Sequence, residues 1–97
     1  MRMMLKMTMP VDRGNAAFKD GSMQKAIETM VNQLKPEATY FYPSDGQRTA
    51  LIVFNLEKES DMVGTLEPAW LGMEADIELV PVMNLDDLMA GFQSMPH

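Results

Sequence analysis

The stretch that decides the fold is residues 47–57, QRTALIVFNLE, which is the clearest strand in the sequence. Successive side chains of a strand point to opposite faces of its sheet, so Ala50, Ile52 and Phe54 share one face. The residues between them, Leu51 and Val53, are also apolar. A strand with one face in water alternates apolar with polar residues. This strand is therefore predicted to be covered on both faces.

A second strand precedes this one and is predicted to pair with it. Residues 38–42, ATYFY, are rich in the aromatic and β-branched side chains that are typical of strands. The connection contains Asp45 and Gly46, and glycine takes the positive φ of a tight turn without steric cost. We therefore predict an antiparallel hairpin that joins residues 37–42 to residues 48–57.

The residues before the hairpin predict one strand and one helix. Residues 2–9 alternate as a strand does, and Pro10 ends it because proline has no N–H to donate. Residues 13–34 predict a helix, although Gly21 is expected to weaken its middle. The helix then begins in earnest at residue 20 or 22, with residues 15–19 as a separate first turn. Its apolar stripe has helical spacing and comprises Met23, Ile27, Met30, Val31 and Leu34.

Residues 60–71 predict the next helix, with Ser60 as its N-cap. Pro68 is expected to kink or restart this helix, because its ring removes one N–H and crowds the preceding turn. Gly72 is the expected end of the helix. The predicted apolar face comprises Met62, Val63, Leu66, Trp70 and Met73.

The last two elements are a strand over residues 75–83 and a short helix over residues 85–93. Pro81 assigns the strand to an edge of the sheet, because a proline inside a central strand would break the hydrogen-bond ladder. Asn84 is the predicted N-cap of the helix. Its apolar stripe comprises Leu85, Leu88, Met89 and Phe92.

This order, β-α-β-β-α-β with a short C-terminal helix, predicts one α+β domain over residues 1–97 with a ferredoxin-like sandwich. Right-handed crossovers place the strands of residues 2–9 and 48–57 in the centre of the sheet. Both longer helices then cover one face. The other face is too apolar to remain bare, so we expect two copies to pack through it as a homodimer.

The sequence resembles the dimeric α+β barrel group, which includes muconolactone-isomerase-like proteins, cofactor-free antibiotic-biosynthesis monooxygenases and small uncharacterised bacterial proteins. The resemblance rests on four runs of sequence, which are similar to one uncharacterised bacterial family of this group. The runs are KPEATYF at 35–41, RTALIVF at 48–54, LEPAWL at 66–71, and IELVPVM at 77–83 with LDDL after it. It implies a homodimer whose two sheets face each other, and it assigns no catalytic residue.

Composition excludes several classes of function. The net charge of −6 argues against nucleic acid as a partner, because binding phosphates requires clustered Lys and Arg. The absence of cysteine excludes disulfides, thiolate catalysis and cysteine-based zinc sites. No apolar run approaches the length of a membrane span, and the apolar N-terminus lacks a signal cleavage motif, so the expected location is the cytoplasm. No cofactor is expected.

The twelve methionines are an unusual number for 97 residues. Methionine is flexible and polarisable, so it fills irregular gaps in a core or lines adaptable binding surfaces. Core filling is the favoured interpretation, because most of these residues fall on apolar stripes. No metal site is expected. The single histidine, His97, is interpreted as a frayed end rather than as a general base or ligand.

Six residues are candidates for a ligand site on the inner sheet face, each with a purely structural alternative: Lys6, Tyr40, Tyr42, Asn55, Trp70 and Glu78. Lys6 and Glu78 are expected on neighbouring strands, as an ion pair or with Glu78 as a base. The two tyrosines and Asn55 offer hydrogen bonds to a ligand carbonyl or phenol, or serve packing alone. Trp70 is either a pocket wall or a core anchor.

The leading hypothesis is a small homodimeric α+β barrel protein whose inner sheet face binds a small apolar or aromatic molecule. The alternative is a cofactor-independent enzyme of the monooxygenase or isomerase type, with Tyr40, Asn55, Lys6 and Glu78 as its polar groups. A third possibility is an interaction module without a cavity.

Overall fold

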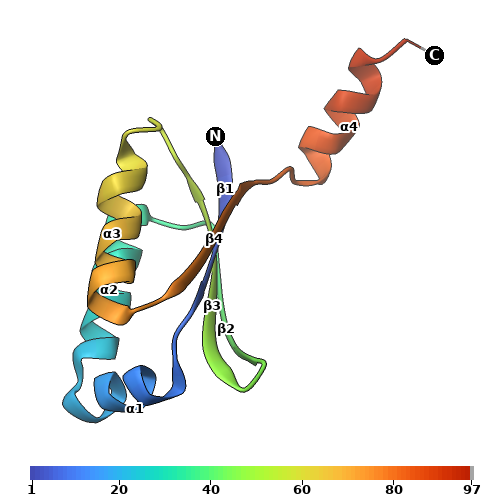
Figure 1. Ribbon diagram of the computed structural model, residues 1–97. Coiled ribbons are helices and arrows are strands. Elements are labelled where there is room, and N and C mark those ends of the chain that lie inside the picture. The colour runs from blue at the N-terminus through green and yellow to red at the C-terminus, as the bar shows by residue number, and fades with distance from the viewer. Residues whose placement is uncertain (97) are drawn as a thin grey trace.

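The computed structural model describes residues 1–96, which form an α+β fold with one four-stranded sheet and four helices (Figure 1). His97 lies outside the described residues. The elements follow the order β-α-α-β-β-α-β-α. They are β1 (Arg2–Thr8), α1 (Val11–Asp20), α2 (Ser22–Leu34), β2 (Ala38–Ser44), β3 (Gln47–Asn55), α3 (Asp61–Met73), β4 (Asp76–Pro81) and α4 (Leu85–Ser94).

The sheet has the strand order β2-β3-β1-β4, and every neighbouring pair is antiparallel. The prediction that the first and third strands lie in the centre is confirmed, as is the edge position of the strand that contains Pro81. Leu5 of β1 lies between Ile52 of β3 and Leu79 of β4. This arrangement is compatible with the ferredoxin-like plan.

The core lies between the sheet and α3. Its residues confirm the alternation predicted for the central strand. Ile52, Phe54 and Leu56 are buried on the helix side, whereas Leu51 and Val53 on the other side are half-buried. The buried cluster comprises Met3, Leu5, Ala50, Ile52, Phe54, Leu56 and Leu66. Burial of this apolar area is the main force that holds the sheet to its helices.

The chain forms two helices that meet at Gly21 instead of one continuous helix over residues 13–34, and the second helix begins at Ser22, one of the two predicted starts. Gly21 has a φ of 81°, in the left-handed region that glycine adopts without strain. The carboxylate of Asp20 accepts a hydrogen bond from the N–H of Ser22 at 2.8 Å, which satisfies one of the free N–H groups at the start of α2. The weakness expected at Gly21 is therefore a complete break, and α1 already begins at Val11.

The helix does not restart at Pro68, since α3 runs through this residue, and it ends beyond the predicted stop at Gly72. The helix buries Leu66 and Ala69, with Met62 and Met73 half-buried beside them. This spacing rotates the buried face away from the predicted one. Val63 is 67% exposed and Trp70 is 45% exposed, so Trp70 is not a core anchor.

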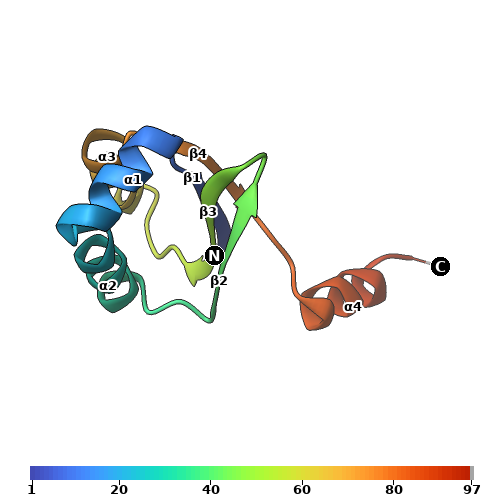
Figure 2. The same cartoon turned by 90° about the horizontal axis from the view of Figure 1, so that it is seen from below.

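The helix α4 projects away from the rest of the molecule, on the side of the sheet opposite to α1, α2 and α3 (Figures 1 and 2). Asn84 caps it as predicted, in a reciprocal pair of hydrogen bonds with Asp87. Arg2 on β1 forms ion pairs with both Asp87 and Glu37. The whole apolar stripe of α4 is exposed in this chain: Leu85, Leu88, Met89 and Phe92.

Within residues 1–96, none of the helices combines the length and the apolar character that crossing a membrane requires.

Candidate functional site: a cavity between the helices and the sheet

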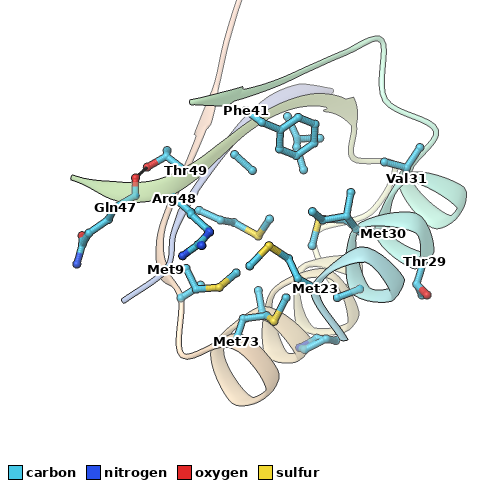
Figure 3. Close-up of a pocket in the computed structure, with 18 of the residues that line it drawn as sticks. Met9, Met23, Thr29, Met30, Val31, Phe41, Gln47, Arg48, Thr49 and Met73 are labelled. Atoms are coloured by element: carbon cyan, nitrogen blue, oxygen red, sulfur yellow. Dashed lines mark hydrogen bonds between the residues drawn. The ribbon is translucent and has the colours of Figure 1, made fainter. Parts of the chain in front are cut away.

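A cavity of about 880 Å³ lies between the helix side of the sheet and the three helices that face it. Its floor is the end of the sheet near the β2–β3 turn, where Phe41, Ala50 and Met7 lie side by side on neighbouring strands. Met23, Ile27 and Met30 of α2 form much of the opposite wall. Figure 3 shows Phe41, Met23 and Met30 directed into the space between strands and helices.

The cavity exists because α2 faces the sheet without packing tightly on it. None of the residues of α2 is fully buried, although its apolar stripe has the predicted spacing. The floor is also low at its centre, since Ala50 has only a methyl group where its neighbours on the strand, Ile52 and Phe54, have large side chains. Close-packed interiors leave few voids larger than a water molecule, so a space of this size is unusual for a core.

Methionine side chains dominate the cavity wall. Five of them line it from β1, its following loop, α2 and α3: Met7, Met9, Met23, Met30 and Met73. In Figure 3 the sulfurs of several of these residues gather in the middle of the view. Flexible, polarisable side chains can adapt to apolar guests of different shape. The predicted core filling by methionine is thus incomplete on this side of the sheet.

The polar groups at the end of the cavity include Arg48 of β3 and Asn15 of α1. The Arg48 guanidinium donates a hydrogen bond to Oδ1 of Asn15 at 3.0 Å. It also lies over the ring of Phe18, with its carbon 5.9 Å from the ring centroid. The N–H of Met9 donates to the backbone oxygen of Arg48 at 3.0 Å, so both the backbone and the side chain are held.

Three of the six residues predicted for a ligand site lie together, but on the opposite face of the sheet from the cavity. Lys6 stands directly opposite Glu78 across β1 and β4, as predicted. Leu51 lies on the other side of Lys6, and Tyr40 lies beyond Leu51. One row of the sheet thus brings Lys6, Tyr40 and Glu78 onto a shared surface.

The other three candidates lie apart from that row. Asn55 pairs with Arg2 at the far end of β3, where its side-chain oxygen accepts a hydrogen bond from the Met1 nitrogen at 2.7 Å. Tyr42 lies opposite Thr49, two residues beyond Tyr40 on the same face of β2, and it also borders the cavity near the β2–β3 turn. Trp70 is exposed on α3 and does not line it.

Sequence reasoning missed Arg48 and the methionines as cavity residues. A signal for Arg48 was present, because it shares the strand face of Ala50 and Ile52 by simple alternation. The methionines of α2 were recognised as an apolar stripe. Their sequence spacing, however, does not say how far the helix stands from the sheet.

Two ionisable groups outside the cavity have shifted pKa values. Hydrogen bonding to Glu37, with the charges of Glu37 and Asp87, raises the pKa of Arg2 above its ordinary value. Hydrogen bonding to Ser22 holds the pKa of Asp20 below its ordinary value. Within residues 1–96, no group of three or more His, Asp or Glu side chains gathers in a way that could hold a metal ion.

Comparison with protein-family models finds no match for this chain, and comparison with curated proteins finds no significant relative. The functional argument therefore rests on the geometry of the cavity and of the two sheet faces.

Proposed function

We propose that this protein is a homodimer of the dimeric α+β barrel type that binds a small apolar or aromatic molecule. The dimer is supported by the sheet face that α1, α2 and α3 leave uncovered (Figure 2). This face carries Met4, Leu51, Val53 and Val80, which are only half-buried, and Tyr40, which is 62% exposed. Contiguous apolar patches of this kind mark interaction surfaces.

The size of the molecule supports the same proposal. Its accessible surface is 6865 Å², against roughly 5,600 Å² for a compact monomer of 10.9 kDa. Its radius of gyration is 15.5 Å, against about 12.5 Å for a compact chain of this length. The excess surface of roughly 1,300 Å² exceeds the ~800 Å² that each partner buries in a standard interface. The exposed apolar stripe of α4 contributes to this excess.

The proposal of ligand binding rests on one observation, the apolar cavity of about 880 Å³. Small-molecule sites are typically concave, mostly apolar and roughly 300–1,000 Å³ in volume. The bare sheet face is needed for the dimer, whereas the cavity is formed by residues of one chain on the other side of the sheet. We therefore place the ligand between α2 and the sheet rather than on the inner sheet face.

Native mass spectrometry on protein purified without added ligand tests both halves of the proposal. We expect a dimer, with additional mass from a retained small molecule. A monomer at micromolar concentration would contradict the dimer and leave the apolar face without its proposed partner.

A paired substitution then locates the ligand, with N-phenyl-1-naphthylamine as a fluorescent apolar probe. Ala50→Phe places a ring in the cavity, whereas Leu51→Phe places the same ring one residue away on the other face. We expect Ala50→Phe to weaken probe binding at least tenfold, because the ring occupies the site, and Leu51→Phe to leave it unchanged. The reverse pattern would move the site to the inner sheet face.

A second candidate function, a cofactor-independent enzyme of the monooxygenase or isomerase type, draws on the position of Lys6 opposite Glu78. With Tyr40 in the same row, these groups offer an acid, a base and a hydrogen bond on one surface. Substitution of Lys6 and Glu78 tests this candidate, as described below.

A further inference from the structure

The charges around the cavity differ from those of the whole chain. The chain has 14 acidic residues and 8 lysines and arginines. Nevertheless, within the part that the structure describes, no Asp or Glu lines the cavity. The charged residues that line it are Lys25 and Arg48, and both are positive. A wall that is selectively cationic in an acidic protein raises the local concentration of anions.

Arg48 occupies the end of the apolar floor. It lies two residues before Ala50 on the same face of β3, so its side chain points to the helix side of the sheet. Figure 3 shows it beside Met9.

The arginine is held in place by neutral groups of α1. Asn15 accepts one hydrogen bond and the Phe18 ring lies beneath the guanidinium. The side chain also crosses Gly14 so closely that a Cβ on that residue would lie 2.8 Å from Nη1 of Arg48.

No carboxylate neutralises this cation. Among residues 1–96, the side-chain ion pairs within 4 Å are those that Arg2 forms with Glu37 and Asp87. A guanidinium carries five N–H donors in a planar fork that fits a carboxylate with two parallel bonds, and Asn15 uses one donor. Arg48 therefore has the capacity to receive an anion in an orientation that is already fixed.

We propose that the cavity ligand is an amphipathic carboxylate, with its apolar body among the methionines and its carboxylate on Arg48. This inference rests on the proposed function and specifies the class of ligand. The apolar body requires the methionine-lined wall, and the carboxylate requires a cation at its end. Lys25 on the exposed side of α2 is the only other described cation in the wall and serves as the control.

Isothermal titration of the full chain with decanoate and with 1-decanol tests the inference, since the two share a chain length and differ in the head group. We expect decanoate to bind about 10–100-fold more tightly, which is the effect of a charge-assisted hydrogen-bonded pair. Equal affinities would overturn the inference and leave the proposed function intact. Absence of binding by decanoate, decanol and N-phenyl-1-naphthylamine alike would overturn the proposed function itself.

Substitutions then assign the head group to one residue. Arg48→Met should remove the preference for decanoate while decanol binds as before, and the unchanged decanol affinity shows that the cavity is still folded. Lys25→Met is the matched loss of charge and should keep the preference. Gly14→Ala should reduce the preference without removing the charge, because the added methyl group displaces the guanidinium. A preference that survives Arg48→Met, or that is lost in Lys25→Met alone, would overturn the assignment to Arg48.

Discussion

The two faces of the sheet are built from alternate residues of the same strands, and they are left incomplete in different ways. On the helix side, Ala50, Ile52 and Phe54 are buried, yet α2 stands off and leaves a cavity. On the other side, Leu51 and Val53 are half-buried and lie on a surface that α1, α2 and α3 do not cover. A concave apolar gap within one chain suits a small molecule, whereas a broad apolar face suits a protein surface.

This comparison shows that apolar composition alone does not determine what covers a face. Both faces of β3 have the alternating positions of a buried strand, and the path of the chain decides which one receives the helices. The predictions below test the difference between the faces, beginning with the largest effect.

Phe54→Ala should give the largest loss of stability, about 3–5 kcal/mol in the free energy of unfolding, because it opens a hole in a close-packed core. Val53→Ala, on the opposite face of the same strand, should cost about 1.5 kcal/mol, the transfer free energy of the carbons removed. Urea denaturation at one fixed protein concentration measures the free energy of unfolding of both variants. A loss in Val53→Ala as large as that in Phe54→Ala, although it removes far fewer carbons, would contradict the shallower burial of Val53.

Leu51→Glu should weaken the proposed dimer about 100-fold or more, because it places an unpaired carboxylate in an apolar interface. Sedimentation equilibrium measures the change, and circular dichroism shows whether the monomer keeps its fold. Ala16→Glu, on the exposed side of α1, adds the same charge away from the sheet and should not alter the dimer. If Leu51→Glu leaves dimerisation unchanged, the bare face is not the interface.

Lys6→Met and Glu78→Gln should each change the affinity for N-phenyl-1-naphthylamine less than twofold, because both residues lie on the face opposite to the cavity. Because both residues also lie on the proposed dimer face, each single substitution leaves the other charge unpaired there and should lower the thermal stability of the dimer. Fluorescence titration and thermal unfolding provide the two measurements. A strong loss of binding in both variants would favour the row of Lys6, Tyr40 and Glu78 as the site.

Asp20→Asn should give the smallest effect, and only in one range of pH. Hydrogen bonding to Ser22 lowers the pKa of Asp20 in the folded state, so the ionised carboxylate stabilises the start of α2 above the ordinary pKa of an aspartate. That contribution is lost as the pH falls through the lowered pKa. Thermal unfolding should therefore show the wild type slightly more stable than Asp20→Asn at pH 7, with the difference vanishing in strong acid. A difference independent of pH would assign the effect to another cause.

Much of the fold could be predicted from the residues, because short-range rules act on it directly. Alternation in β3 identified the buried positions, and Pro81 identified an edge strand. The preference of asparagine for helix starts identified Asn84 as the N-cap of α4. Gly21 was recognised as a weak point, but its positive φ, and hence the break between α1 and α2, depends on how both helices meet the sheet.

The candidate site could not be predicted to the same extent, because it depends on distances between layers. The stripe of α2 has the same spacing whether the helix packs tightly on a sheet or stands away from it. In α3, both Trp70 and Ala69 fit an apolar face, and only packing selected the small residue for burial. The row of Lys6 and Glu78 was predicted because strand order and alternation are sufficient to define it.

The central position of β1 has a consequence for how the molecule is made. Met4 pairs with Val53 on one side and with Val80 on the other, so both partners of this strand come much later in the chain. A ribosome therefore releases an apolar, methionine-rich strand well before either neighbour exists. Such non-local pairing slows folding and prolongs the exposure of aggregation-prone apolar segments. The nascent chain can complete its sheet only after β4 has emerged, so translation and chaperone access influence the yield of folded protein.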